Sequence, residues 1–358
     1  MINIHCNITG TPDDTPVIIV DTGITRFGDL STPGRCTFPL PDDTPPHGAY
    51  IHWNGKSART VIAIAPNVPL TPGDYEGGSL YEPIPTLVYD AFSLTALTTL
   101  NDHFITADEG MRWWWRGATD MLLPARLEVG EDIRPLLEQR ANAGANIVRS
   151  LAMGYPFWPS GAPVREETAR AFFTLAAEYA LYVEWVVFAG TRDNMPELAK
   201  QQAFWLQNIR MVRDYSNVLV ELLNEAGHGS QRIDPAQFGD PIGVLASHGS
   251  GLTDAPPVTP LWDFATYHPR RDRPPDARGF TNYDAYEFQA EWPKPCPFIP
   301  DEGIKPHEYG FDTRWAYQMG LHAAACAGGT FHSDAGVRSL LWTPQEVRCA
   351  EAFYSGIG

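Results

Sequence analysis

Two glutamates, Glu225 and Glu302, stand at the ends of apolar runs in this sequence. Glu225 follows Asn224 directly after VLVELL (218–223), and Glu302 ends PFIPDE (297–302). Because a carboxylate buried without partners is costly, we expect both groups where a strand emerges from a core. Two carboxyl groups that face each other across a cleft can divide the roles of proton donor and nucleophile. Either glutamate alone is often a helix cap or a surface residue, so the pair is the stronger signal.

These glutamates need a scaffold that brings distant strand ends together. From about residue 100, helix-like and strand-like segments alternate. Residues 131–144 have apolar positions at helical spacing and run into ANIVRSLAMG; 165–180 are followed by LYVEWVVFAG, and 196–216 by NVLVELLNEAG. The pattern therefore predicts three successive helix-then-strand units.

The C-terminal part continues the alternation. Further strand candidates are VLASHG, WDFATYH, PFIPDEG and GGTFHSD, and a helix is expected near 313–326. The last helix opens with TPQE, where Thr343 is the predicted N-cap, Pro344 lies in the first turn and Glu346 completes a capping box.

With RWWWRGATD as the first, there are eight strand candidates, mostly near-continuously apolar as in parallel sheets. About 260 residues follow the N-terminal region, which is typical of a (β/α)8 barrel. An open doubly wound sheet would need an early Gly-rich phosphate loop, and the sequence has no GxGxxG, GKS or GKT. We therefore predict an α/β fold, a TIM barrel in which ELLNE is strand four and FIPDE strand seven. The 77 positions from 225 to 302 then span three units of about 26 residues.

The N-terminal region has a different texture. Residues 1–90 are dense in Pro, Gly, Thr and Asp and contain short β-like runs such as PVIIVD (16–21). Such runs separated by turn residues predict a small, sandwich-like all-β module. We expect residues 91–103 to be a linker or transition and residues 104–358 to form the barrel.

Bulk composition limits the partners. The net charge of -17 argues against nucleic acid and anionic membrane surfaces, which are bound through clustered Lys and Arg. The sequence contains no run of 18 consecutive apolar residues, so membrane insertion is not predicted. The 11 Trp offer flat apolar faces to neutral ring-shaped ligands, although most Trp fill cores.

The five cysteines have no CxxC spacing, so neither a disulfide framework nor a zinc site is indicated. Cys6 and Cys36 could pair, but free thiols are favoured. The N-terminus MINIHCNITG lacks the basic and apolar regions of a secretory signal. We expect synthesis in a cytoplasm, which leaves later release or virion association open.

The strand-four Asn-Glu, the strand-seven glutamate and their spacing resemble the clan of retaining (β/α)8-barrel glycoside hydrolases that includes cellulases, mannanases and β-galactosidases. The resemblance covers about residues 104–350. It implies that Glu225 is the general acid/base, that Asn224 holds the sugar 2-hydroxyl and that Glu302 is the nucleophile. It implies no cofactor and an oligo- or polysaccharide substrate.

Other positions match the clan less specifically. Arg149, at the end of NIVRSL, matches an arginine that hydrogen-bonds the nucleophile; its other interpretation is a salt bridge of the barrel. Tyr267 and His268 match a strand-six position near the nucleophile or substrate, although a lone histidine there is often structural. Trp158 and Trp262 are candidate sugar platforms or core residues.

Two strand ends depart from the clan. Strand three ends in VVFAGT without a histidine, and strand eight ends in TFHSD where many members carry a stacking Trp. His332 and Trp342 could substitute as substrate-binding residues. His332 with Asp334 also invites a metal interpretation, but no third ligand follows at a suitable spacing.

The resemblance implies a double displacement at β-linked glycosidic bonds, with the two carboxyl groups about 5 to 5.5 Å apart. The main alternative is a non-catalytic glycan-binding or structural protein, for example a virion or surface-assembly component, on a hydrolase-like barrel. The N-terminal module could then support a homo-oligomer or a larger assembly. A metal-dependent hydrolase is a third alternative without a convincing ligand set.

Overall fold

The computed structural model describes two compact units, Met1–Phe92 and Ser93–Gly358. Side chains are described for residues 94–153, 162–239, 241, 243–251, 262–268, 296–301, 306–307 and 310–358. Within residues 2–62 the description covers the backbone of the strands, and at 308–309 the backbone of a short helix.

The N-terminal unit contains two antiparallel sheets, with strand orders β1-β5-β4 and β3-β2-β6-β7. Their bounds are β1 (Ile2–Asn7), β2 (Val17–Val20), β3 (Thr25–Phe27), β4 (Asp29–Thr32), β5 (Arg35–Leu40), β6 (His47–Trp53) and β7 (Lys56–Ile62). The β1–β5 register sets Cys6 opposite Cys36. Sandwich-like packing of the two sheets and free thiols at Cys6 and Cys36 stay predictions.

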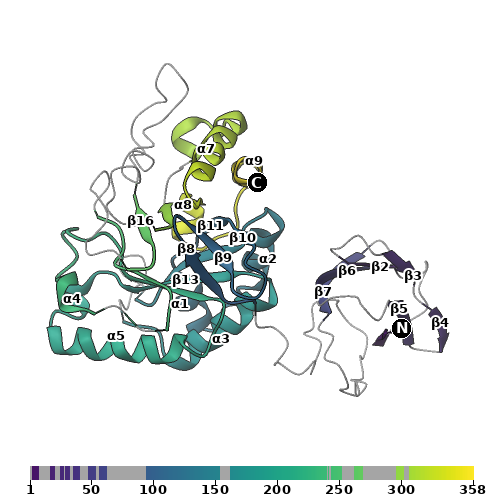
Figure 1. Ribbon diagram of the computed structural model, residues 1–358, viewed down its shortest axis with the longest axis horizontal. Helices are drawn as coiled ribbons and strands as arrows, with labels where there is room; N and C mark the ends of the chain where they lie inside the picture. The colour runs from purple at the N-terminus through teal and green to yellow at the C-terminus, as the bar shows by residue number, and fades with distance from the viewer. Residues whose placement is uncertain are drawn as a thin grey trace. The chain divides into compact units, whose positions relative to one another are not determined.

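Parallel strands form the centre of the second unit (Figure 1). They are β11 (Trp115–Thr119), β12 (Ile147–Leu151), β13 (Tyr182–Phe188), β14 (Val218–Leu223), β15 (Ala246–Ser247), β16 (Ala265–Tyr267), β17 (Phe298–Pro300) and β18 (Gly328–Phe331). A six-stranded sheet runs β15-β14-β13-β12-β11-β18, and β16 pairs with β17. The first strand thus lies beside the last.

Backbone hydrogen bonds join the two sheets at the ends of their strands. Asp263 donates its N–H to the carbonyl of Ala246 at 3.0 Å, before β16, and Ala327 donates to Phe298 at 3.0 Å, before β18. The strands therefore follow one another in chain order around a ring, which fits the predicted α/β barrel. ELLNE belongs to the fourth strand and FIPDE to the seventh, as predicted.

The long strands β12, β13 and β14 are buried along their whole length. Successive side chains alternate between the barrel interior and the surrounding helices, so apolar residues are needed on both faces. Trp185 of β13 illustrates the outward face, since it packs on Phe173 with ring centroids 5.0 Å apart and donates to Asn208 of helix α5 (Leu198–Val212) at 2.8 Å.

Helices follow the strands and lie outside them (Figure 1). Their bounds are α1 (Leu123–Glu128), α2 (Arg134–Asn142), α3 (Glu166–Glu178), α4 (Thr191–Asn194), α5 (Leu198–Val212), η2 (Pro235–Gln237), η3 (Pro306–Tyr309), α7 (Thr313–Ala325), α8 (Asp334–Val337) and α9 (Pro344–Ile357). The capping box predicted for the last helix is present, because Thr343 accepts from the Glu346 N–H and Glu346 accepts from the Thr343 N–H. Within the described residues, no helix is long and apolar enough to cross a membrane.

A small antiparallel sheet covers the end of the barrel where the strands begin. It consists of β8 (Leu97–Leu100), β9 (His103–Thr106) and β10 (Arg112–Trp113). Phe104 packs on Trp115 and Phe264, with centroids 5.8 and 5.7 Å apart. This aromatic layer fills one end of the barrel. In barrels of this kind ligands bind at the opposite end, where the strands finish, which we call the open end. Strand β8 lies within the segment 91–103 that we predicted as a transition.

Candidate active site

The chain turns sharply at the predicted acid/base residue. Glu225 has φ +52°, which is uncommon outside glycine and is found mainly where neighbouring structure enforces it. On either side the backbone is held: the Asn224 N–H donates to Phe188 at 2.9 Å, and the Ala226 N–H to Ser250 at 3.0 Å. The turn places a carboxyl group with a 19% exposed side chain immediately after β14, at the open end of the barrel.

Asn224 is oriented by the second strand. Arg149 of β12 donates from Nη2 to Asn224 Oδ1 at 3.0 Å. Since a guanidinium only donates, the amide oxygen must face the arginine and the amide NH2 is directed elsewhere. The half-buried Asn224 can therefore offer N–H donors to an oxygen of a ligand at the strand ends.

Arg149 stands among three buried carboxyl groups. It binds Glu221 through two bonds, Nε to Oε2 at 3.1 Å and Nη2 to Oε1 at 2.9 Å. Its Nε also lies 2.6 Å from Asp301 Oδ2 and 3.6 Å from Glu184 Oε2. All four side chains are fully buried. Arg149 thus lies in a salt-bridge cluster of the barrel, the second of the two interpretations that we considered for it.

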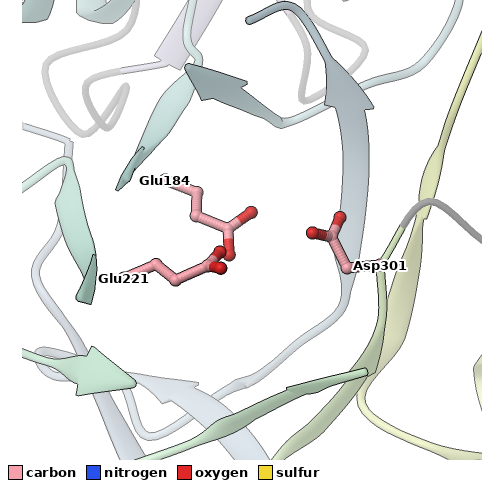
Figure 2. Close-up of side chains that lie close together, drawn as sticks. All are labelled: Glu184, Glu221 and Asp301. Carbon is pink, nitrogen blue, oxygen red and sulfur yellow. The ribbon is translucent and has the colours of Figure 1, made fainter. Parts of the chain in front are cut away.

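Figure 2 shows Glu184 and Glu221 with their carboxyl groups adjacent and Asp301 facing them from across the barrel. Oxygen atoms of the three groups lie within 4.8 Å of one another, a separation that could suit a metal ion. The ion pairs with Arg149 give these oxygens a cation from the chain itself. The three carboxyl groups therefore form an internal salt-bridge network around Arg149.

The cluster carries more acid than base. If every group were ionised, three carboxylates would face one guanidinium in a fully desolvated space, which is strongly unfavourable. Burial and the negative charges of Asp301 and Glu221 raise the pKa of Glu184 well above the ordinary value of a glutamate. Burial and these neighbouring charges therefore favour the protonated form of Glu184.

His268 connects this cluster to Glu225. It follows β16, is fully buried, and has its Nδ1 3.3 Å from Glu225 Oε1 and its Nε2 3.4 Å from Asp301 Oδ2. Each ring nitrogen of His268 thus lies near a carboxyl oxygen, so a proton on either nitrogen would face an acidic group. His268 thus lies beside Glu225, and its position near the nucleophile or substrate stays a prediction.

Two other predicted site residues, Tyr267 and His332, are buried. Tyr267, the last residue of β16, belongs to the hydrophobic core and packs with Phe298, with ring centroids 6.1 Å apart. His332 is buried at the end of β18 and lies 3.1 Å from Thr119 Oγ1. The side chain of Asp334 is 66% exposed, and its Oδ2 lies 3.5 Å from Nε2 of His307. Asp334 thus faces solvent, whereas His332 is buried.

Two tryptophans considered as platforms are core residues. Trp342 is 3% exposed, with Arg140 stacked 3.9 Å from its ring centroid, and Trp262 is 4% exposed against His248. Buried rings cannot stack on a sugar, so the suggestion that Trp342 replaces the missing strand-eight platform was wrong.

Glu302 and Trp158 lie outside the described residues. Strand β17 ends at Pro300, followed by buried Asp301, so the described chain stops one residue before the predicted nucleophile. The predicted separation of Glu225 and Glu302, and a contact between Arg149 and Glu302, stay predictions.

The buried acids Glu184, Glu221 and Asp301 were not among the residues predicted for the site. A signal was present, because LYVEWVVF and VLVELL each carry a glutamate in the middle of an otherwise apolar run. A charge at such a position requires a buried partner. That the partner is Arg149, 72 residues before Glu221, depends on the pairing of the strands.

No protein-family model matches the chain, and no curated protein matches it. Among solved structures, the fold is similar to a glycoside hydrolase of family 5 from Bacteroides vulgatus, with TM-score 0.50 and 15% identity over 68% of this chain and 63% of that chain. It is also similar to a structure described as a glycoside hydrolase, with TM-score 0.50 and 14% identity over 70% of this chain and 68% of that one. The chain thus spans less than two thirds of the family 5 structure. The resemblance to this clan is confirmed at the level of the barrel fold.

Proposed function

We propose that this protein is a retaining glycoside hydrolase that cleaves β-linked glycosidic bonds, with Glu225 as acid/base and Glu302 as nucleophile. The observation that carries the proposal is the arrangement at the end of β14. There Asn224 is oriented by Arg149, and Glu225 is presented beside His268 at the open end of the barrel. The similar barrels of two glycoside hydrolases support the same reaction class.

In the first step, Glu302 attacks the anomeric carbon while Glu225 transfers its proton to the leaving oxygen. Partial exposure lets Glu225 reach a bound substrate, while His268 limits the directions in which its carboxyl group can turn. The product of this step is a glycosyl ester on Glu302 and a free aglycone.

In the second step, Glu225 acts as a base and removes a proton from water, which attacks the same carbon and releases the sugar with retained configuration. Asn224 would hold the sugar 2-hydroxyl through its amide NH2 in both steps, where such bonds strengthen in the transition state. Arg149 contributes by fixing the amide in that orientation.

The substrate class follows from the surroundings. A net charge of -17 disfavours polyanionic ligands, and the residues at the strand ends are amide, imidazole and carboxyl groups suited to hydroxyls. We therefore propose a neutral β-linked oligo- or polysaccharide as substrate. The N-terminal unit is proposed as a module for binding or assembly.

The test is a screen of aryl β-glycosides and neutral β-linked polysaccharides against the wild-type chain, Glu225→Gln and Glu302→Gln. The proposal predicts turnover by the wild type and a loss of at least about a thousandfold in kcat for each variant. Proton NMR of the first-formed sugar should show the β-anomer.

A matched control is Glu109→Gln, the same chemical change at an exposed residue between β9 and β10, at the closed end of the barrel. It should turn over at the wild-type rate. Unchanged turnover in either active-site variant, or an α-anomer as first product, would refute the assignment. Glycan binding without turnover in the wild type would favour the non-catalytic alternative.

A further inference from the structure

Glu184 has the weakest ionic contact in the buried cluster. Glu221 receives two hydrogen bonds from Arg149, at 3.1 and 2.9 Å, and Asp301 lies 2.6 Å from Arg149 Nε. The nearest approach of Glu184 to the same guanidinium is 3.6 Å, beyond hydrogen-bond range. Since Arg149 can neutralise only part of the cluster, Glu184 is the carboxyl group that best tolerates a proton.

The position of Glu184 gives that proton a partner. Its carboxyl group lies beside that of Glu221 (Figure 2). A protonated Glu184 can donate to a Glu221 oxygen, whereas an ionised one would face two further negative charges. The flanking strands present Arg149 and Glu221, Asp301 faces it from across the barrel, and the side chains of α3 buried behind β13 are uncharged.

We propose that Glu184 is a positioning residue of the active site: protonated against Glu221, it leaves Arg149 directed toward Asn224 and Asp301. Arg149 Nη2 serves both Glu221 and Asn224, at 2.9 and 3.0 Å. An ionised Glu184 would attract Arg149 Nε, which already lies beside Glu221 and Asp301. This attraction would draw the guanidinium away from the amide of Asn224. The proton on Glu184 thus helps to orient the amide of Asn224 through the side chains of Glu221 and Arg149.

Burial and the charges of Asp301 and Glu221 raise the pKa of Glu184. This direction agrees with a proton placed between Glu184 and Glu221. The proposal concerns a residue that does not touch substrate. It rests on the proposed function only for its consequence in turnover, because the proton itself can be observed without any substrate.

The first experiment is infrared spectroscopy of the full chain near pH 8, where Asp120, with a pKa of about 6, is mostly ionised. The difference spectrum of the wild type minus Glu184→Gln should contain the C=O stretch of a neutral carboxylic acid, which separates Glu184 from any proton on Glu225. Glu178→Gln is the matched control, since Glu178 is a half-buried glutamate with a pKa also raised by burial, on the outer helix α3. Absence of a band assignable to Glu184, or its persistence in Glu184→Gln, would overturn the proposal.

The second experiment compares Glu184→Gln with Glu184→Ala on whichever substrate the wild type cleaves. The Gln side chain keeps the shape and the donor, so kcat should stay within about threefold of the wild type. The Ala side chain removes the donor and leaves a void, and kcat should fall about ten- to a hundredfold with a smaller change in KM, since positioning acts in the transition state.

Both variants are compared at equal folded fraction, measured by circular dichroism. Equal kcat for Gln and Ala would contradict a positioning role even if both fold. Absence of turnover in the wild type would count against the proposed function, while the infrared band would still decide where the proton resides.

Discussion

The guanidinium of Arg149 on the second strand lies 3.0 Å from the amide oxygen of Asn224 at the end of the fourth. This contact joins the buried salt-bridge cluster to the strand end where Glu225 is presented, and His268, between Asp301 and Glu225, forms a second link. The orientation of a polar side chain at the mouth therefore depends on charges placed deep inside the barrel, among Glu184, Glu221 and Asp301.

Arg149→Lys should destabilise the chain strongly. A lysine ammonium cannot reproduce the two-bond contact with Glu221 while also reaching Asn224, so buried carboxylates lose their partner. We expect the free energy of unfolding, from urea titration, to fall by about 3 to 5 kcal/mol. Arg165→Lys is the control, because Arg165 is 69% exposed beside Glu128 and should cost less than about 1 kcal/mol. Similar losses for the two variants would contradict the importance of the cluster.

Stability should respond to pH through Glu184. Its pKa is raised in the folded state, so the folded chain holds a proton that the unfolded chain releases above about 4.5. Unfolding therefore releases a proton in the window between 4.5 and the raised folded value, and the free energy of unfolding falls as pH rises through it.

Glu184→Gln removes this dependence. Urea titrations of both chains at several pH values should show the variant gaining stability relative to the wild type as pH rises. A constant difference across the window would contradict a raised pKa at Glu184.

His268→Phe should impair proton donation by Glu225. Nδ1 of His268, at the end of strand six, lies 3.3 Å from Oε1 of Glu225. Loss of that contact should lower kcat about ten- to a hundredfold for substrates with poor leaving groups, and much less for dinitrophenyl glycosides, which need no proton.

The control is His103→Phe, at the closed end of the barrel, where the histidine pairs with exposed Asp102. It should behave as the wild type on both substrates. Equal losses of His268→Phe on good and poor leaving groups would show that His268 acts on something other than the proton.

Gly249→Ala should destabilise the strand-five end. Gly249 has φ +97°, and a Cβ there would lie 2.0 Å from the carbonyl oxygen of Leu223, next to Asn224. We expect a loss of more than about 1 kcal/mol in urea titration. Gly243→Ala separates the two causes, because its φ is +79° with no atom within 4 Å of the added methyl. An equal loss for both would mean that backbone conformation alone, without the close approach, sets the cost.

Local signals in the sequence predicted much of the barrel. Apolar strands, helical spacing and the capping box at Thr343 and Glu346 are properties of contiguous residues, and the order of the strands followed from their alternation with helices. The position of Asn224 and Glu225 at a strand end followed in the same way.

Contacts between distant residues could not be predicted. The partners of Arg149 depend on how strands two, four and seven face one another inside the barrel, which no local pattern encodes. Trp342 illustrates the reverse error, since it lies where a platform was suggested along the chain but packs under Arg140 in the core.

The most direct test of the central assignment is covalent trapping of the nucleophile. The wild-type chain is incubated with an activated 2-deoxy-2-fluoro β-glycoside of the sugar that the screen identifies, digested, and analysed by mass spectrometry. Because the fluorine slows the second step, the glycosyl ester should accumulate. We expect the added mass on the peptide that contains Glu302, with no labelling of Glu302→Gln. A label on any other residue would contradict the account.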